Sequence, residues 1–544
     1  MKLKKYHKLI LSVLSGGLLS LGYTQLGLGW TMLFAFIPIL ILRDAGTKDE
    51  NKKGSNYVFL WSLISFIIWN AISTWWIYYS TAPGAVVAIL LSSLFMASVI
   101  WFAALANKYL GKKTGYVAFV SFWMSFEYLF LNSQISWPWL ILGNSFANNI
   151  AWVQWYEFTG HLGGSLWILT VNILLYELMK SRMENIGKNI LIRKYLTLAL
   201  VIFIPLTYSL IRYYTYSETD NPVDVVVFQP NIDPYDEKYD IPDWEQVENM
   251  FVLVDSLMDD SVDFIVGPET AIPNGMWLDE LIEERNINFI RNYLNQYPNT
   301  ACIIGAVTRK YYPKGNDKTE TAKPFGSTGD FYDLYNTAIY IDTSDNFQVY
   351  HKSRLVPGVE MMPYPKIFGF LGELIVDLGG IRGRLGYQEE QTPLVRESDS
   401  LKIGSVICYE SVYGEFYSKF VKNGAQLMAI ITNDGWWSNT AGHRQHKSYA
   451  SLRAVETRRS IARSANTGIS CFVNQRGDIL MACDWWEKDV IRTKLNLNDK
   501  ITFYTKYGNY MSRMSLVVSA LLALAIIPNI LMKRKKKKNN TVLQ

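Results

Sequence analysis

The sequence predicts a membrane protein in two parts, a multi-pass α-helical membrane domain and an α/β domain inserted before its last helix. Two observations predict this fold. Long apolar segments fill the first 213 residues and return near the C-terminus, whereas residues from about 214 to 511 alternate short β-branched runs with polar, helix-like stretches. A chain of 544 residues also exceeds the usual size of one soluble domain, which favours at least two units.

Eight apolar segments are predicted to span a membrane as helices, which gives eight transmembrane helices. A spanning helix needs about 20 mostly apolar residues, and several segments approach that length only with their flanks. The N-terminal segment also has the basic start and apolar core of a signal peptide, but a second apolar segment follows almost at once, which favours a membrane helix. The segments are Leu9–Tyr23, Trp30–Leu42, Val58–Ile77, Gly84–Asn107, Tyr116–Leu131, Gly163–Leu178, Tyr195–Tyr213 and Ser515–Leu531.

The distribution of positive charge predicts the topology. If all eight segments span, the ends and connections on one side hold 22 Lys and Arg residues, and the short connections on the other side hold none. By the positive-inside rule, the N and C termini are then cytoplasmic. The expected domains are a seven-helix transmembrane domain (1–213), an extracytoplasmic domain (214–511), and a C-terminal helix with a basic tail (512–544).

The basic tail does not predict nucleic-acid binding. Its run "KRKKKK" directly follows an apolar segment, where positive charge holds a helix end at an anionic leaflet. The net charge of +5 is small for this length and adds no argument for nucleic acid.

The region from 214 to 511 is predicted to fold as an α/β domain with polar groups at its strand ends. Helices are expected at 244–259, 278–297, 413–423 and 446–465, and the stretch 310–330 is expected to be a peripheral loop. The predicted strands are "VDVVVFQPNI", "VDFIVGPETAIP", "ACIIGAVTR", "YNTAIYID", "LKIGSVICYE", "AQLMAIITND" and "SCFVNQRGDILMA".

Three residues, two of them in these strand-like segments, suit covalent acyl transfer. Glu269 follows "FIVGP", Lys352 lies in "VYHKSRLVPGVE", and Cys408 follows "IGSVI". A thiolate can attack a carbonyl, a carboxylate can take its proton, and an ammonium can stabilise the oxyanion. A nearby lysine is also expected to lower the pKa of the cysteine. Taken singly, each residue also has a structural interpretation. Glu269 could cap a helix, Lys352 could pair with a surface acid, and Cys408 could be a buried core thiol.

The cysteines allow other interpretations. The four cysteines permit three complete disulfide pairings, and the sequence does not choose among them. Cys302, Cys408 and Cys471 lie within strand-like apolar runs, which favours buried thiols over a disulfide framework. A metal site is not predicted, because no Cys-x-x-Cys or His-rich spacing occurs. A Cys–His dyad with His443 or His446 as the base is the rival scheme for the nucleophile.

The segments "GPETAIP", "YHKSRLVPGVE" and "VICYES", in this order, resemble the nitrilase superfamily, whose members use a Glu–Lys–Cys triad on an αββα sandwich. Seven predicted helices before that domain and one after it resemble the bacterial apolipoprotein N-acyltransferases in particular. "SWPWLILGN", "YEFTGHLGGSLWILTVN", "ITNDGWW" and "SLRAVETRRSIARSANTGIS" carry the likeness along most of the chain.

The resemblance implies roles for individual residues. Glu269 corresponds to the general base, Lys352 to the oxyanion-stabilising residue and Cys408 to the nucleophile. The resemblance also implies essential carboxylates at Glu360 and Glu410, supporting residues at Asn336 and Tyr409, and substrate-binding aromatic residues at Trp139 and Trp436. Two features depart from the family pattern: "PGVEMMPY" replaces the usual Pro-Phe-Gly-Glu, and the 310–330 stretch is inserted between the Glu and Lys segments.

The activity that the resemblance implies is transfer of a fatty acyl group from a phospholipid, through a Cys408 thioester, to the α-amine of an S-diacylglyceryl-cysteine lipoprotein. The implied location is the bacterial inner membrane, with a periplasmic catalytic domain, no cofactor and a monomeric chain. Two alternatives stay open: a membrane-tethered nitrilase-type amidase that releases acyl groups to water, and a non-catalytic scaffold or transporter. Glu127 and Glu157, in or beside membrane segments, are expected to make structural hydrogen bonds.

Overall fold

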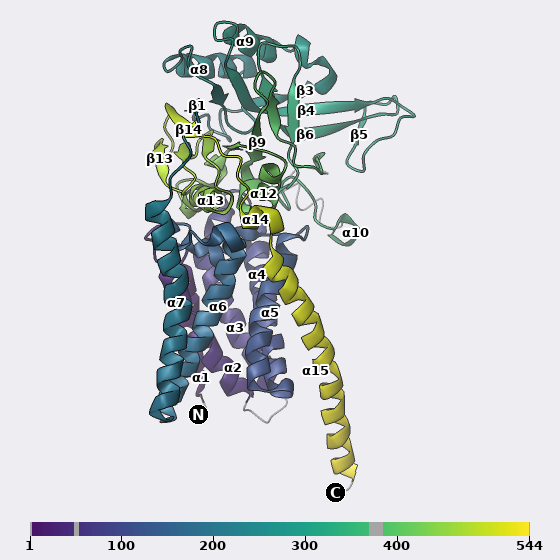
Figure 1. The fold of residues 1–544 in the computed structure, drawn as a ribbon. Helices are drawn as coiled ribbons and strands as arrows, with labels where there is room; N and C mark the ends of the chain where they lie inside the picture. Colours follow the sequence, from purple (N-terminus) through teal and green to yellow (C-terminus); the bar gives the residue numbers. More distant parts are fainter. Residues whose placement is uncertain (1–2, 48–53, 369–383, 543–544) are drawn as a thin grey trace. The chain divides into compact units, whose positions relative to one another are not determined.

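The computed structural model describes residues 3–47, 54–368 and 384–542, and the chain divides into two compact units. Unit 1 comprises Met1–Trp75, Gly84–Tyr214 and Tyr507–Gln544, and unit 2 comprises Trp76–Pro83 and Thr215–Lys506. Unit 2 therefore includes a short connection between two helices of unit 1 as well as the long segment predicted to be α/β. Figure 1 shows the helical and the mixed parts of the chain.

Unit 1 is helical. Within the described residues, each of the eight apolar segments overlaps an α-helix, although the second, Trp30–Leu42, is α-helical only from Ile37. Short 3₁₀ turns lie between several of the helices. The α-helices are α1 (Lys5–Leu21), α2 (Ile37–Thr47), α3 (Gly54–Thr74), α4 (Ala82–Leu110), α5 (Lys112–Leu131), α6 (Tyr156–Met183), α7 (Lys188–Thr215) and α15 (Tyr510–Val542). The 3₁₀ turns are η1 (Gly29–Leu33), η3 (Pro138–Leu140), η4 (Leu142–Phe146) and η5 (Ile150–Trp152).

Six helical stretches among the described residues are long and apolar enough to cross a membrane. Helix α1, with 17 residues, and helix α5, which carries the buried Glu127, are not among these six. The six stretches are Gly29–Gly46, Asn56–Tyr79, Ala82–Leu110, Tyr156–Met183, Lys188–Thr215 and Tyr510–Ile530.

Two buried carboxylates of unit 1 are held by hydrogen bonds, as the sequence predicts. Glu127 accepts from the Trp123 indole at 3.0 Å and from the Leu142 backbone N–H at 2.9 Å. Glu157 accepts from the Tyr208 hydroxyl at 2.6 Å and pairs with Arg212 at 3.2 Å. Because a buried charge without partners is costly, these contacts explain why an apolar unit tolerates both residues.

Unit 2 contains two β-sheets. Eight strands form the first sheet, in the order β14-β1-β2-β4-β6-β5, with β3 paired to β4 and β7 paired to β6. They are β1 (Pro222–Gln229), β2 (Phe264–Val266), β3 (Ile272–Trp277), β4 (Ala301–Tyr312), β5 (Lys323–Phe325), β6 (Asp330–Ile341), β7 (Gln348–His351) and β14 (Asp489–Asn496). Six strands form the second sheet, in the order β13-β12-β11-β10-β9-β8: β8 (Leu394–Arg396), β9 (Leu401–Ile407), β10 (Leu427–Thr432), β11 (Ile461–Ala465), β12 (Cys471–Val473) and β13 (Ile479–Ala482).

The centre of each sheet is parallel. Strand β2 pairs in parallel with β1 and β4, and β10 pairs in parallel with β9 and β11. These strands are buried almost throughout, as expected for β-branched runs covered on both faces. The sheets pack on one another, and the Ser464 hydroxyl of β11 donates to the Phe228 carbonyl of β1 at 2.8 Å.

Helices cover the outer faces of the two sheets. Val247 and Ile290, from α8 (Asp243–Asp255) and α9 (Arg285–Leu294), share one apolar core with Val226 and Ile265 of the first sheet. Helices α12 (Gly414–Lys422) and α13 (Ala441–Thr457) lie beyond the second sheet, so that unit 2 has four layers (Figure 1). The remaining short elements are α10 (Pro365–Phe368), α14 (Phe503–Tyr507), η2 (Trp75–Tyr79), η6 (Leu278–Glu283), η8 (Cys408–Val412) and η9 (Asp434–Trp437).

The structure corrects three predicted elements. The helix predicted at 446–465 ends at Thr457, where Arg458 adopts a left-handed conformation, and the remaining residues form the central strand β11. The helix predicted at 278–297 is split into η6 and α9. The 310–330 stretch is partly ordered, because strand β5 pairs with β6.

Candidate active site

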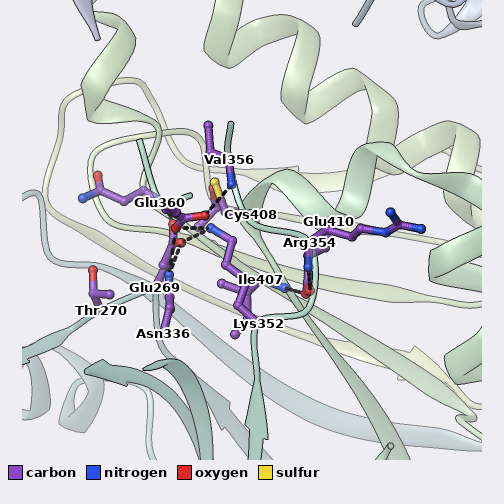
Figure 2. Close-up of polar contacts among 12 residues, drawn as sticks. Glu269, Thr270, Asn336, Lys352, Arg354, Val356, Glu360, Ile407, Cys408 and Glu410 are labelled. Carbon is purple, nitrogen blue, oxygen red and sulfur yellow. Dashed lines mark hydrogen bonds and ion pairs between the residues drawn. The ribbon is translucent and has the colours of Figure 1, made fainter. Parts of the chain in front are cut away.

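Each of the three predicted catalytic residues follows a strand of unit 2. Glu269 comes shortly after β2, Lys352 directly after β7, and Cys408 directly after β9, as the first residue of η8. All three are buried. Figure 2 shows their side chains converging, together with Asn336 of β6 and Glu360. The structure therefore brings the triad together from both sheets.

Glu269 is held by three donors. Its Oε1 accepts from Lys352 Nζ at 3.0 Å and from Asn336 Nδ2 at 2.7 Å, and its Oε2 accepts from the Asn433 backbone N–H at 3.0 Å. A carboxylate offers about four acceptor positions. The arrangement thus leaves an acceptor position on Oε2 for a proton from substrate or thiol.

Lys352 lies between two carboxylates. Its Nζ donates to Glu269 at 3.0 Å and to Glu360 Oε1 at 2.7 Å. Its side chain is only 1% exposed, and its backbone N–H donates to the Asn336 carbonyl at 2.8 Å. Because an ammonium has three N–H donors, one is left to meet an oxyanion once both carboxylates are bound.

Burial and charge together set the protonation of this pair. Burial alone would raise the pKa of Glu269, but the Lys352 charge and hydrogen bonds from Lys352 and Asn336 hold that pKa below its usual value. Burial alone would lower the pKa of Lys352, but Glu269 and Glu360 raise it well above the usual value. The resting site therefore holds an ionised base beside an ammonium.

Cys408 has a backbone conformation that is unfavourable for a residue other than glycine. Its φ of +51° lies in the left-handed region, which costs a non-glycine residue on the order of 1–3 kcal/mol. Its carbonyl accepts from the Ser411 hydroxyl at 2.7 Å, which helps to hold the turn. Functional sites are where such strain is usually retained, because the turn presents the side chain at the strand end.

The charge state of Cys408 differs from the sequence expectation. Burial, followed by the negative charge of Glu269, raises the pKa of the thiol well above its usual value, and the Lys352 charge offsets this only in part. The lysine acts in the expected direction, but the net effect is opposite. The cysteine is therefore a neutral thiol at rest, and a base would have to remove its proton before or during any nucleophilic attack.

Glu410 joins the segments that carry the lysine and the cysteine. Its Oε1 accepts from the Ser353 and Arg354 backbone N–H groups at 2.6 and 3.0 Å, directly after Lys352. Its Oε2 accepts from the Ile407 N–H at 2.9 Å, directly before Cys408. Burial raises the pKa of Glu410 to about 7 despite these backbone donors. Glu410 thus binds the main chain next to Lys352 and next to Cys408, as Figure 2 shows.

The histidines of the rival dyad scheme have other partners. His446 Nδ1 lies 2.9 Å from Asp434, and its Nε2 lies 3.1 Å from the Cys408 carbonyl and 2.9 Å from the Ser411 hydroxyl. His443 stacks on Trp485 at 3.7 Å, and burial lowers its pKa to about 3. His446 therefore supports the cysteine backbone, and neither ring is arranged as the base of a dyad.

The three remaining predicted residues, which are all aromatic, lie in different parts of the chain. Tyr409, next to the nucleophile, is buried and packs edge-on against Tyr413. Trp436 in η9 is half-buried and packs against Tyr235 at 5.0 Å, and its carbonyl accepts from the Ser80 hydroxyl at 3.2 Å. Trp139 belongs to unit 1, where its ring stacks on Trp137 at 5.0 Å.

Two contributors to the site carry no signal in the sequence. The Asn433 backbone N–H binds Glu269, and a main-chain donor cannot be read from residue type. Lys238, only 4% exposed, donates to the hydroxyl of Thr270, the residue after Glu269. Its surroundings, "DPYDEKYD", resemble a solvent-exposed loop. Lysines beside aromatic and acidic residues are common in loops, so this pattern does not distinguish Lys238.

The four cysteines are free and buried. Among the described residues, no group of three or more His, Cys, Asp or Glu side chains is arranged to hold a metal ion.

Comparison with known families matches both parts of the chain. The family model described as "Carbon-nitrogen hydrolase" matches residues 220–502, more than half of the chain. The chain therefore belongs to the carbon-nitrogen hydrolase family. A second model, "Apolipoprotein N-acyltransferase N-terminal domain", matches residues 15–174.

Curated relatives span nearly the whole chain. A protein of Chlorobaculum tepidum named apolipoprotein N-acyltransferase is 28% identical over 498 residues, which cover 90% of each chain. Proteins of the same name from Geobacter metallireducens and Thermotoga maritima are 24% and 26% identical, and each alignment covers 94% of this chain and at least 92% of the relative. The relatives and the two family matches confirm the resemblance to apolipoprotein N-acyltransferases that the sequence indicated.

Proposed function

We propose that this protein is a membrane-bound acyltransferase that moves a fatty acyl group from a phospholipid, through a Cys408 thioester, to the α-amine of a diacylated lipoprotein. The observation that carries this proposal is the buried cluster in which Lys352 lies 3.0 Å from Glu269 and 2.7 Å from Glu360, with the strained Cys408 beside it. The names of the curated relatives give the acceptor class.

The first half-reaction makes the thioester. The Cys408 sulfur attacks the ester carbonyl carbon of the phospholipid while Glu269 takes the thiol proton, and the free N–H of Lys352 stabilises the oxyanion. The tetrahedral intermediate collapses, the C–O bond breaks, and Glu269 returns the proton to the departing lysophospholipid oxygen. Ionised Glu269 beside a neutral thiol is the charge state that this step requires.

The second half-reaction discharges the thioester. The α-amine of the S-diacylglyceryl-cysteine attacks the thioester carbonyl, Lys352 again stabilises the oxyanion, and Glu269 takes a proton from the nitrogen. The C–S bond then breaks, and the proton passes to the departing sulfur. The products are an N-acylated lipoprotein and the free Cys408 thiol.

The membrane location follows from the substrates. Lipid tails gain about 0.8 kcal/mol for each CH₂ that stays out of water, so neither substrate leaves the bilayer readily. We propose that all eight apolar segments span the inner membrane, with both termini cytoplasmic and residues 214–511 on the periplasmic side. Trp139 and Trp436 are proposed to contact the lipid substrates, with Tyr409 and Asn336 supporting the site. We propose that the monomer is active.

The function is tested by intact-protein mass spectrometry after incubation with phospholipid. We expect an added acyl mass on the wild type and on Cys302→Ala, a control at another buried cysteine, and no added mass on Cys408→Ala. A diacylated lipopeptide should then remove the adduct much faster than water does. Rapid discharge by water would indicate a hydrolase, and absence of any adduct on the wild type would overturn the proposal.

The topology is tested by labelling introduced cysteines in intact spheroplasts with a membrane-impermeant maleimide. Lys314→Cys, exposed in unit 2, should react without permeabilisation, whereas Glu184→Cys, exposed between α6 and α7, should react only after it. The opposite pattern would place residues 214–511 in the cytoplasm and contradict the proposed orientation.

A further inference from the structure

A second buried lysine lies next to the catalytic carboxylate. Lys238 is in the loop between β1 and α8 and is 4% exposed. Its backbone carbonyl accepts from Gln246 Nε2 at 2.8 Å, and the same amide donates to the Ile241 carbonyl at 2.7 Å. Because Gln246 belongs to α8, the loop is anchored to a helix while the lysine side chain reaches inward.

The ammonium of Lys238 donates to the hydroxyl of Thr270. Thr270 directly follows Glu269 and has a φ of +47°, a conformation that β-branched residues rarely adopt. Glycine would take this conformation without steric cost but has no hydroxyl to accept the Lys238 hydrogen bond.

The backbone around Glu269 is also packed against strand β4. The Gly305 N–H donates to the Pro268 carbonyl at 3.0 Å, and a Cβ at Gly305 would lie 2.6 Å from Glu269 Cα and from the Thr270 nitrogen. The main chain that carries the carboxylate is therefore in close contact with a neighbouring strand, and the Lys238–Thr270 bond adds a side-chain restraint to it.

Lys238 also adds positive charge near the base. Burial lowers its pKa to about 8, and the attraction of Glu269 opposes that shift. In turn, the positive charge of Lys238 contributes to lowering the pKa of Glu269. Of the other charged or titratable groups, Lys352 lowers the pKa of Glu269, the Cys408 thiol is affected by the Glu269 charge, and Glu360 pairs with the same Lys352 ammonium.

We propose that Lys238 is a positioning residue for acyl transfer, which holds the Thr270 hydroxyl so that Glu269 faces Lys352 and the thiol, and which supplies a second positive charge beside the base. This inference rests on the function proposed above, because it assigns a role only through Glu269. The Lys238 ammonium contacts the Thr270 hydroxyl, one residue away from the carboxylate on which the role depends.

The test measures the rate of Cys408 acylation by mass spectrometry in the full-length protein. Lys238→Met and Thr270→Val should each slow acylation about tenfold or more with the KM for phospholipid unchanged, since a hydrogen bond to a charged group is lost. The double variant should be no slower than the slower single variant, because both changes remove the same bond. Lys238→Arg and Thr270→Ser should recover most of the rate.

The pH dependence separates positioning from a merely structural role. Loss of the Lys238 charge raises the pKa of Glu269, so the acid limb of the pH–rate profile should move to higher pH in Lys238→Met but stay in place in Thr270→Val. Lys323→Met, which removes a half-buried lysine of β5, should leave both the rate and the acid limb unchanged.

The outcomes distinguish a failure of the Lys238 positioning role from a failure of the acyltransferase function. Acylation of Lys238→Met at the rate of Lys323→Met, an unmoved acid limb, or effects that multiply in the double variant would overturn the positioning role. If Lys238→Met does not fold, equal rates for Thr270→Ser and Thr270→Val would overturn it. Absence of an adduct on the wild type would instead reject the acyltransferase function, on which the inference depends.

Discussion

Lys352 lies closer to Glu360 than to Glu269: its Nζ is 2.7 Å from the first carboxylate and 3.0 Å from the second. Glu360 is in turn held by the Val356 backbone N–H at 2.8 Å. If Glu269 takes a proton as we propose, it loses its charge, and the second carboxylate, Glu360, would keep Lys352 paired. Glu360 is therefore expected to affect the rate of Cys408 acylation by holding the Lys352 ammonium in place.

We expect Glu360→Gln to slow the acylation of Cys408 about 10- to 100-fold, the loss typical of a hydrogen bond to a charged group. The glutamine amide can accept from only one of the two donors, Lys352 or Val356, and its NH₂ faces the other. The rate is measured by intact mass after mixing with phospholipid, with the exposed Glu390→Gln as control. Equal rates for the two variants would contradict a role for Glu360.

Glu269→Gln should move two reactions of the same thiol in opposite directions. Acylation should fall by about 10²–10⁴, because the general base is lost. Alkylation by iodoacetamide, which needs only the thiolate, should become faster at a given pH, because the Glu269 charge raises the pKa of Cys408 in the wild type.

The alkylation rate is measured by mass spectrometry from about pH 6 to 10, around the ordinary thiol pKa of about 8.5, and the two proteins are compared at each pH. Cys408→Ala gives the background from the other three cysteines. If alkylation and acylation fall together in Glu269→Gln, the carboxylate serves to keep the thiol accessible, and the general-base assignment is wrong.

The strand ends that carry the triad could be predicted because they combine two strong local patterns. Runs such as "FIVGP" and "IGSVI" are buried strands, and a polar residue directly after such a run lies at a sheet edge. Glu269 and Cys408 occupy these edges, whereas Lys352 follows β7, a half-buried strand that is not among the predicted strands.

Strand β11 could not be predicted because its sequence does not resemble a core strand. It follows helix α13, which ends where Arg458 adopts a left-handed conformation, a position where glycine is the usual signal. Arg463 lies within the strand and is fully buried, and it is tolerated because it pairs with Asp434 at 2.6 Å. Pairing across 29 residues is a tertiary property that hydropathy along the chain does not report.

His446→Gln tests the rival scheme for the nucleophile. Its Nε2 contacts the Cys408 carbonyl and the Ser411 hydroxyl, so the variant should weaken the support of the turn and slow acylation only about tenfold. A Cys–His dyad predicts a loss at least as large as that of Glu269→Gln. Rates are compared after the two variants are matched for folded protein by thermal unfolding.

Glu410→Gln should destabilise unit 2 by about 1–3 kcal/mol. In the wild type both Glu410 oxygens accept from backbone N–H groups, whereas in the variant the amide NH₂ would face one of those donors and leave it without an acceptor. The loss should depend on pH. Burial raises the pKa of Glu410 from 4.5 to about 7, so the folded state binds more protons than the unfolded state between these values. The stability that this group contributes is fully present below about pH 4.5 and is lost as the pH rises through about 7. Thermal unfolding from pH 4.5 to 8 should therefore show the deficit of Glu410→Gln shrinking as the pH rises, whereas a deficit that stays constant would mean that Glu410 is ionised throughout.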